Sequence, residues 1–225
     1  METPNLIDAL TKDLKPVTPL RSPEKRFAIG LFVGLCFVAA VIVFEGLRRD
    51  LSQVVGSSRF YIEVGLTLVV SLSSGLCAFF LSVPGDSRWR PAFRSTVLFT
   101  FVWVVYLLTR FLEGHSGTPG LSRALTVGVG CAETLFMSAL VPMGVFLWLI
   151  RRAAPLRPYL SGGLTLLSVG ALGMAAVQVM CPGEDIFHLL FWHFLPVGLL
   201  TGLGGFIGRL ALIKKTNFDR SKTSL

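Results

Sequence analysis

Six separate stretches of the chain are long enough and apolar enough to cross a membrane as helices. The hydrocarbon core of a bilayer is about 30 Å thick, so a crossing helix needs about 20 mostly apolar residues. The six stretches are Phe27–Phe44, Val64–Pro84, Ser95–Leu112, Ala124–Ile150, Tyr159–Met180 and Ile186–Gly208. Only 15% of the 225 residues are charged, against about 25% in soluble domains. The sequence therefore predicts an all-α integral membrane protein, a bundle of six transmembrane helices with a short cytoplasmic N-terminal segment.

Lysine and arginine residues are distributed unequally between the two sides of this bundle. Six spans place both termini on one side, which receives 15 of the 21 basic residues, while the other side receives five and Arg209 lies at a helix end. Basic residues accumulate on the cytoplasmic side of membrane proteins, so we expect both termini in the cytoplasm. The net charge of +8 is then mainly a membrane-surface property. We expect contact with the lipid bilayer and no direct nucleic acid binding.

The chain divides into three parts, because the connections between the spans are too short to hold a folded domain. Residues 1–26 form a cytoplasmic segment, residues 27–212 the transmembrane domain, and residues 213–225 a basic cytoplasmic tail. Small residues four apart allow close helix contacts, which we expect inside the bundle. These pairs are Gly30 with Gly34 and Gly204 with Gly208.

The N-terminal segment is long enough to bind another protein. Its apolar residues recur first at helical spacing, at Leu6, Ile7, Leu10 and Leu14. Prolines at positions 16, 19 and 23 then force an extended conformation. A short amphipathic helix followed by extended apolar residues fits the groove of a partner protein. The alternative is a segment that lies on the lipid surface or serves as a disordered tether, and the residues alone leave both open.

Thiol, imidazole and carboxyl side chains gather near the outer ends of the last three spans. Cys131 is expected seven residues into the fourth span, about 10 Å deep, and Cys181 ends the fifth span. Glu133, His188 and His193 are expected at comparable depths. Ionisable groups inside a bilayer are costly and indicate function. These side chains can form a disulfide, bind a soft or borderline metal ion, or only hydrogen-bond neighbouring helices.

The other two thiols, Cys36 and Cys77, lie within the first and second spans, where cysteine is an ordinary packing residue. The chain contains no CxxC or HExxH spacing, no nucleophile elbow and no phosphate-binding loop. We therefore expect no enzyme. We also expect no cofactor other than a transient metal ion at the outer cysteine and histidine cluster.

Motifs along the chain carry a resemblance to a known family. An amino-terminal pattern runs from Leu6 to Pro23, LSVPG follows the second span, and RRAAPLRP follows the fourth. The most distinctive motif begins at Cys181–Pro182 and continues through Asp185, His188 and His193 to Pro196. Over essentially its whole length the chain resembles the NrsF family of bacterial membrane anti-sigma factors, the negative regulators of sigma F.

The resemblance implies a protein that holds an extracytoplasmic-function sigma factor at the cytoplasmic face of the bacterial inner membrane. An oxidative or metal-related envelope signal would release it. The cysteines that family members use for sensing match Cys131 and Cys181. The residues that match the amino-terminal pattern, and that we expect to bind sigma, are Leu6, Ile7, Leu10, Asp13, Leu14, Pro16, Val17, Pro19 and Leu20.

Two other classes of protein fit the composition. A membrane thiol oxidoreductase would exchange electrons with quinone through Cys131 and Cys181, but the chain offers no second thiol pair to pass the electrons on. A metal transporter would need polar residues at mid-membrane on several helices and paired broken helices, which the sequence lacks. The anti-sigma factor is therefore the leading prediction.

Overall fold

The computed structural model describes residue 11 and residues 19–113, 128–153, 155–183 and 185–212. Five spans are single helices: α2 (Pro23–Glu45), α4 (Ser58–Leu81), α5 (Trp89–Glu113), α7 (Val129–Arg151) and α8 (Pro158–Met180). The sixth span joins α9 (Ile186–His188), the π-helix η1 (Leu189–Phe194) and α10 (Leu195–Ala211), and a short helix α3 (Leu51–Val54) precedes α4. All six are long and apolar enough to cross a membrane, and the described residues contain no strand. The predicted all-α bundle of six transmembrane helices is confirmed.

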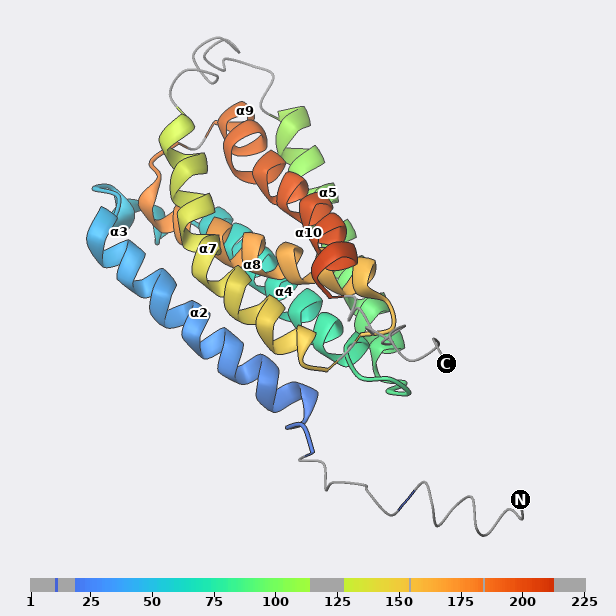
Figure 1. The fold of residues 1–225 in the computed structure, drawn as a ribbon. Coiled ribbons are helices and arrows are strands. Elements are labelled where there is room, and N and C mark those ends of the chain that lie inside the picture. The colour runs from blue at the N-terminus through green and yellow to red at the C-terminus, as the bar shows by residue number, and fades with distance from the viewer. Residues whose placement is uncertain (1–10, 12–18, 114–127, 154, 184, 213–225) are drawn as a thin grey trace.

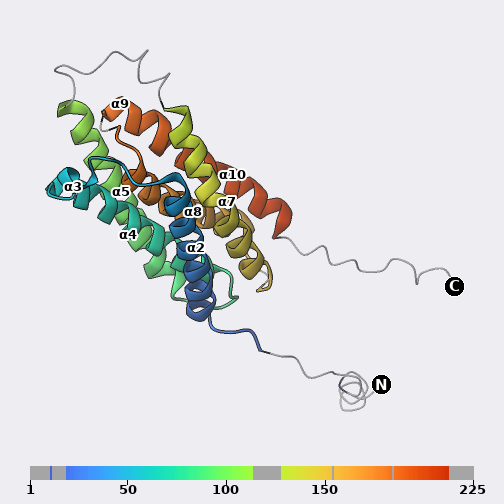
Figure 2. The same cartoon turned by 90° about the vertical axis from the view of Figure 1, so that its left-hand side faces the viewer.

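Successive spans run in opposite directions, so each end of the bundle collects one end of every span (Figures 1 and 2). Helix α2 begins at one end, beside the connection between α4 and α5, and we call this the N-terminal end. Ser22 caps α2 by accepting a hydrogen bond from the Lys25 backbone N–H, and Pro23 occupies the first turn. Helix α7 begins and α8 ends at the opposite end, which we call the cysteine end.

Helix α8 is the central element of the bundle. Of the residues in its most apolar window 83% are buried, against 22% for α2 and 17% for α5, which expose most of their apolar side chains at the surface. Small residues allow this burial: an added Cβ at Gly162 would clash with the Gly204 carbonyl oxygen of α10. Ser71 and Ser168 exchange hydroxyl-to-carbonyl hydrogen bonds of 2.8 and 2.7 Å between α4 and α8. The predicted close contacts of glycines are confirmed at Gly30, Gly204 and Gly208, whereas a Cβ at Gly34 would make ordinary contacts.

Helices α4 and α5 each begin six residues earlier than the sequence predicts. The added residues of α4 include a carboxylate that finds partners on α5. Glu63 of α4 accepts a hydrogen bond of 3.0 Å from the Tyr106 hydroxyl and lies 3.5 Å from Arg110 Nε. Arg110, at the end of α5, therefore has a carboxylate partner within the bundle.

The described part of α7 begins later than the sequence predicts. Gly128 is its N-cap and Val129 its first residue, so Cys131 lies in the first turn of the described helix instead of seven residues inside a longer one. The ring of Trp192 packs where a Cβ at Gly128 would stand, which brings the sixth span against this helix start. Residues 124–127 lie outside the described part of the chain.

Candidate functional site

Two cysteines meet at the cysteine end of the bundle. Cys131 comes from the first turn of α7, and Cys181 is the C-cap residue of α8. Their sulfur atoms lie 2.7 Å apart, and both thiols are free. The extended backbone of Cys181 (φ −89°, ψ 124°) follows from Pro182, which disfavours helix at the residue before it. The end of α8 is thus fixed by sequence at the place where the two thiols meet.

Two histidines reach the same place from the sixth span. Asp185 caps the short helix α9 by accepting from the His188 backbone N–H, and η1 then continues to Phe194. Residues five apart lie on different sides of an α-helix, but the i→i+5 geometry of a π-helix stacks them. The rings of His188 and His193 accordingly have centroids 5.2 Å apart. Pro196 has no N–H to donate to the Trp192 carbonyl, which removes one α-helical hydrogen bond at this segment.

The side chains of Cys131, Cys181, His188 and His193 form one group, which we call the thiol–imidazole cluster. Their sulfur and ring nitrogen atoms all lie within 4.8 Å of one another. The Cys181 sulfur is 3.2 Å from His188 Nε2. Gly183 permits this arrangement, because a Cβ at that position would lie 2.8 Å from the His188 ring. Hydrogen bonding with the Cys131 thiol, and secondly with His188, lowers the pKa of Cys181, which lies just beyond the α8 span.

The donor set of the cluster fits a metal ion. Two thiols and two imidazoles are the ligands that Zn²⁺ and other borderline or soft ions prefer. His193 is 1% exposed, and neither of its ring nitrogens has a hydrogen-bond partner among the described residues. A buried imidazole without partners is costly, and metal ligation would satisfy it. Among the described His, Cys, Asp and Glu side chains, only these four gather in this way.

Glu133, the fifth candidate ligand, does not join the cluster. It is exposed, two residues beyond Cys131 on α7. Two residues correspond to roughly 200° around an α-helix, so Glu133 points away from the side of α7 on which Cys131 meets the cluster. The other two cysteines also lie apart from the cluster: Cys36 is exposed on α2, and Cys77 is buried on α4 with its sulfur 3.7 Å from the Trp89 carbonyl.

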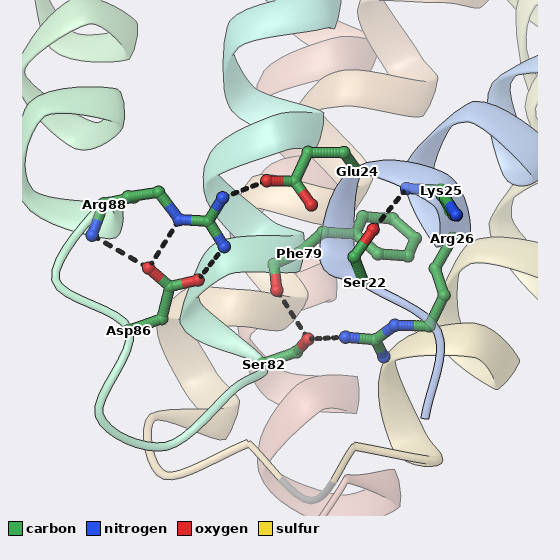
Figure 3. A network of polar contacts seen from close by, with 8 residues as sticks. All are labelled: Ser22, Glu24, Lys25, Arg26, Phe79, Ser82, Asp86 and Arg88. Carbon is green, nitrogen blue, oxygen red and sulfur yellow. Dashed lines mark hydrogen bonds and ion pairs between the residues drawn. The ribbon is translucent and has the colours of Figure 1, made fainter. Parts of the chain in front are cut away.

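A second polar arrangement lies at the N-terminal end of the bundle (Figure 3). Arg26 of α2 is 3% exposed and donates to the Leu149 carbonyl of α7 at 3.2 Å and to the Ser82 hydroxyl at 3.0 Å. The Ser82 hydroxyl donates in turn to the Phe79 carbonyl at 2.6 Å. We call Arg26, Ser82 and the Leu149 carbonyl the arginine clasp. It ties the start of the first span to α7 and to the end of α4.

Charged residues beside the arginine clasp hold the same segment from its other side. Arg88 donates to both carboxylate oxygens of Asp86, at 3.0 and 2.8 Å, and also contacts Glu24 of α2. Asp86 accepts these hydrogen bonds from Arg88, and they lower the pKa of Asp86 and raise the pKa of Arg88. These residues were not predicted from the sequence. Their only signal was that Glu24 and Arg26 directly precede an apolar run.

Most of the predicted sigma-binding residues lie outside the described residues. These are Leu6, Ile7, Leu10, Asp13, Leu14, Pro16 and Val17. The last two, Pro19 and Leu20, are described and exposed, with Leu20 at 54%. The described end of the N-terminal segment therefore presents an apolar side chain at the surface, just before α2.

Comparisons with known proteins agree on one family. The family model described as NrsF, negative regulator of sigma F, matches residues 10–213. The anti-sigma-F factor NrsF of Caulobacter vibrioides (strain NA1000 / CB15N) is 30% identical over 220 residues, which cover 94% of this chain and 99% of the relative. No solved structure matches the chain.

Proposed function

The chain belongs to the NrsF family, the negative regulators of sigma F, and from this premise we propose how it acts as an anti-sigma factor. It holds an extracytoplasmic-function sigma factor at the cytoplasmic face of the inner membrane through residues 6–20 of its N-terminal segment. It releases that factor when an oxidant or a thiophilic metal reaches Cys131 and Cys181. The observation that carries the proposal is the similarity to an anti-sigma factor over 94% of the chain.

Sigma binding is assigned to the N-terminal segment because of its apolar pattern. Leu6, Ile7, Leu10 and Leu14 would line one face of a helix, and the extended stretch after them adds Val17 and Leu20. The exposure of Leu20 supports a segment that is available to a partner. A sigma factor held by these residues would be kept from core RNA polymerase, so the membrane tether would act as a repressor.

A cytoplasmic N-terminal end is supported by the charges of the described bundle. The guanidinium of Arg152 lies 3.8 Å from the centre of the Trp148 ring, and that of Arg157 lies 4.6 Å from the centre of the Trp89 ring. Tryptophan and arginine are typical of the membrane–water interface, and arginine accumulates on its cytoplasmic side. This orientation places the thiol–imidazole cluster toward the envelope.

Signal detection is assigned to the thiol–imidazole cluster. An oxidant would join Cys131 and Cys181 in a disulfide, and a soft or borderline metal ion would be held by both thiols with His188 and His193. Both reactions need the two sulfurs close together, and their separation of 2.7 Å supports the assignment. Either product would link the start of α7 to the end of α8.

Helix α7 offers a route from the signal to the sigma-binding segment. Cys131 lies in its first turn, and the Leu149 carbonyl near its other end accepts the hydrogen bond from Arg26. The two positions are about 27 Å apart at 1.5 Å per residue. A shift of α7 at the thiols would change the arginine clasp, which follows the proposed sigma-binding residues in the sequence. The coupling needs two arrangements of α7, which the experiment below tests.

The test is transcription from a sigma-dependent promoter, measured with oxidants and with thiophilic metals. We expect Cys131→Ser and Cys181→Ser each to fix the output in one state, whereas Cys36→Ser, the matched control on α2, responds normally. Purification of the full-length protein should bring the sigma factor with it before the signal and not after. Normal induction in both cluster variants would contradict the sensing role and leave a membrane anchor for sigma.

The thiol oxidoreductase is the weaker alternative. Electron transfer would need a second thiol pair, and the two remaining cysteines, Cys36 and Cys77, lie on different helices outside the cluster. No observation favours that function over a sensor.

A further inference from the structure

A polar cavity of about 510 Å³ lies beside the thiol–imidazole cluster. Its volume falls within the range of small-molecule sites. One wall is made by α3, the start of α4 and the connection before them, and the other by the ends of α5 and α8 with the sixth span. The lining residues used below are Arg48, Gln53, Arg110, Gln178, Cys181 and His193.

The charges around the cavity are fixed in pairs. Arg48 donates two hydrogen bonds to Asp50, of 2.8 and 2.7 Å, while its backbone N–H donates to the Val179 carbonyl of α8. Arg110 is paired with Glu63, and Arg59, the third arginine of the lining, lies 3.7 Å from Glu113, which is outside the lining. Each guanidinium therefore has a carboxylate beside it. A wall that is polar but nearly balanced in charge favours a small neutral polar molecule over an ion.

Two buried side chains of the cavity have polar atoms without partners among the described residues. His193 lacks a partner for both ring nitrogens, and Gln178, which is 6% exposed, lacks one for Oε1. Both residues line the cavity. Buried polar groups are nearly always hydrogen-bonded, so these atoms call for a polar occupant that can both donate and accept hydrogen bonds.

The two thiols differ in their relation to this cavity. Cys181 lines it and Cys131 does not; Cys131, the more exposed of the two thiols, lines a second cavity of about 150 Å³, which it shares with Cys181. Cys181 also has the His188 ring at 3.2 Å, close enough to take its proton. A cysteine beside a histidine base is the usual arrangement of an activated thiol. The Cys131 sulfur lies 2.7 Å from the Cys181 sulfur.

We propose that this cavity admits small hydroperoxides, that Cys181 is the thiol they oxidise, and that Cys131 is the resolving thiol. The inference rests on the proposed sensing function and assigns separate roles within its site. Hydroperoxides are small, neutral and polar, and they both donate and accept hydrogen bonds. They therefore match the charge balance and the unpartnered atoms of the cavity.

The reaction consumes one hydroperoxide and two thiols. His188 takes the Cys181 proton, the sulfur attacks the terminal peroxide oxygen, and the O–O bond breaks. The alkoxide leaves as an alcohol with the proton from His188, and Cys181 becomes a sulfenic acid. The Cys131 sulfur then attacks the Cys181 sulfur, an S–S bond forms, and the S–O bond breaks. The hydroxide leaves as water with the Cys131 proton, so the peroxide is reduced by the two electrons that the thiols lose.

The test traps the sulfenic acid with dimedone in full-length protein in lipid nanodiscs treated with tert-butyl hydroperoxide. Cys131→Ser should accumulate the adduct on Cys181, at least about tenfold faster than Cys181→Ser accumulates one on Cys131, because Cys181 borders the polar cavity and has the His188 ring at 3.2 Å. Gln53→Trp, at an exposed position of the cavity lining, should slow the labelling of Cys181 severalfold. Val55→Trp, the matched control, is exposed and does not line the cavity.

Equal or faster labelling of Cys131, or equal slowing by Gln53→Trp and Val55→Trp, would overturn the inference. Folding of each variant is checked by its thermal melting in the same nanodiscs. The readout does not involve the sigma factor. Cavity-dependent oxidation of Cys181 without any transcriptional response would support the inference while contradicting the proposed sensing function.

Discussion

The cysteine end and the N-terminal end of the bundle both hold buried polar side chains, but they satisfy them differently. At the N-terminal end, both terminal nitrogens of Arg26 are hydrogen-bonded, and Arg88 is held by two carboxylates. At the cysteine end, His193 and the Gln178 carbonyl oxygen lack partners among the described residues and border a cavity. The first arrangement leaves one buried donor, Arg26 Nε, without a partner among the described residues, whereas the second leaves three such atoms on residues that border a cavity. This difference fits a structural role for the arginine clasp at the N-terminal end and signal detection by the thiol–imidazole cluster at the cysteine end.

The largest effect is expected on sigma binding, from substitutions in the N-terminal segment that precedes the arginine clasp. Leu10→Ala and Leu14→Ala should each weaken sigma binding by about 2–4 kcal/mol, if their burial at the interface resembles burial in a core. Transcription of sigma-dependent genes should rise without a signal, while the protein stays in the membrane. Binding of the purified full-length variants to the sigma factor measures this directly. Repression that persists after residues 1–20 are removed would place the sigma site elsewhere.

The arginine clasp can be removed by substituting Arg26. We expect Arg26→Ala to destabilise the protein by about 2–3 kcal/mol, because it removes two hydrogen bonds from a charged donor and leaves a buried space. Thermal melting in lipid nanodiscs measures the loss, and Arg21→Ala, at an exposed position before α2, is the matched control. If the arginine clasp transmits the signal, Arg26→Ala should also lose induction. An unchanged melting temperature would show that the arginine clasp does not hold the bundle together.

The two ends also differ in how far the sequence predicts them. Apolar length alone predicts all six spans, and the low charge of α8 agrees with its burial. The meeting of Cys131 and Cys181 could be expected only as two thiols at one face, because they are fifty residues apart in sequence. The π-helix that stacks His188 on His193 could not be predicted, since apolar periodicity is uninformative in a continuous run such as LLFWHF. The arginine clasp joins Arg26 to a carbonyl 123 residues away, a contact without any local signal.

The membership of the thiol–imidazole cluster can be tested by comparing substitutions of His193 and Glu133. Zn²⁺ alone serves as the probe, with competition against a chelator in the full-length protein. We expect His193→Ala to weaken Zn²⁺ binding by at least about tenfold, since loss of a ligand costs no less than loss of a supporting residue. Glu133→Gln should leave binding unchanged, because that carboxylate is exposed and outside the cluster. An equal loss in both variants would contradict the four-residue cluster.

The smallest expected effect compares one carboxylate at each end. Asp86 at the N-terminal end and Asp50 at the cysteine end are each hydrogen-bonded by an arginine, which lowers the pKa of both. A carboxyl whose pKa is lower in the folded than in the unfolded protein contributes stability above its unfolded value, about 4, and loses it as the pH falls through the folded value.

Melting temperature should therefore fall on acidification below about pH 4, and each of Asp86→Asn and Asp50→Asn should remove part of that fall. At neutral pH, Asp86→Asn should lower the melting temperature by only about 1–2 °C, because Arg88 is largely solvated and exposed ion pairs contribute little. The variants differ in their second readout: Asp86→Asn loosens the contact of Arg88 with α2, whereas Asp50→Asn weakens the pairing of Arg48 at the cavity wall. Only Asp50→Asn should change the rate of Cys181 oxidation. A change of that rate in Asp86→Asn would mean that the two ends are not separate in function.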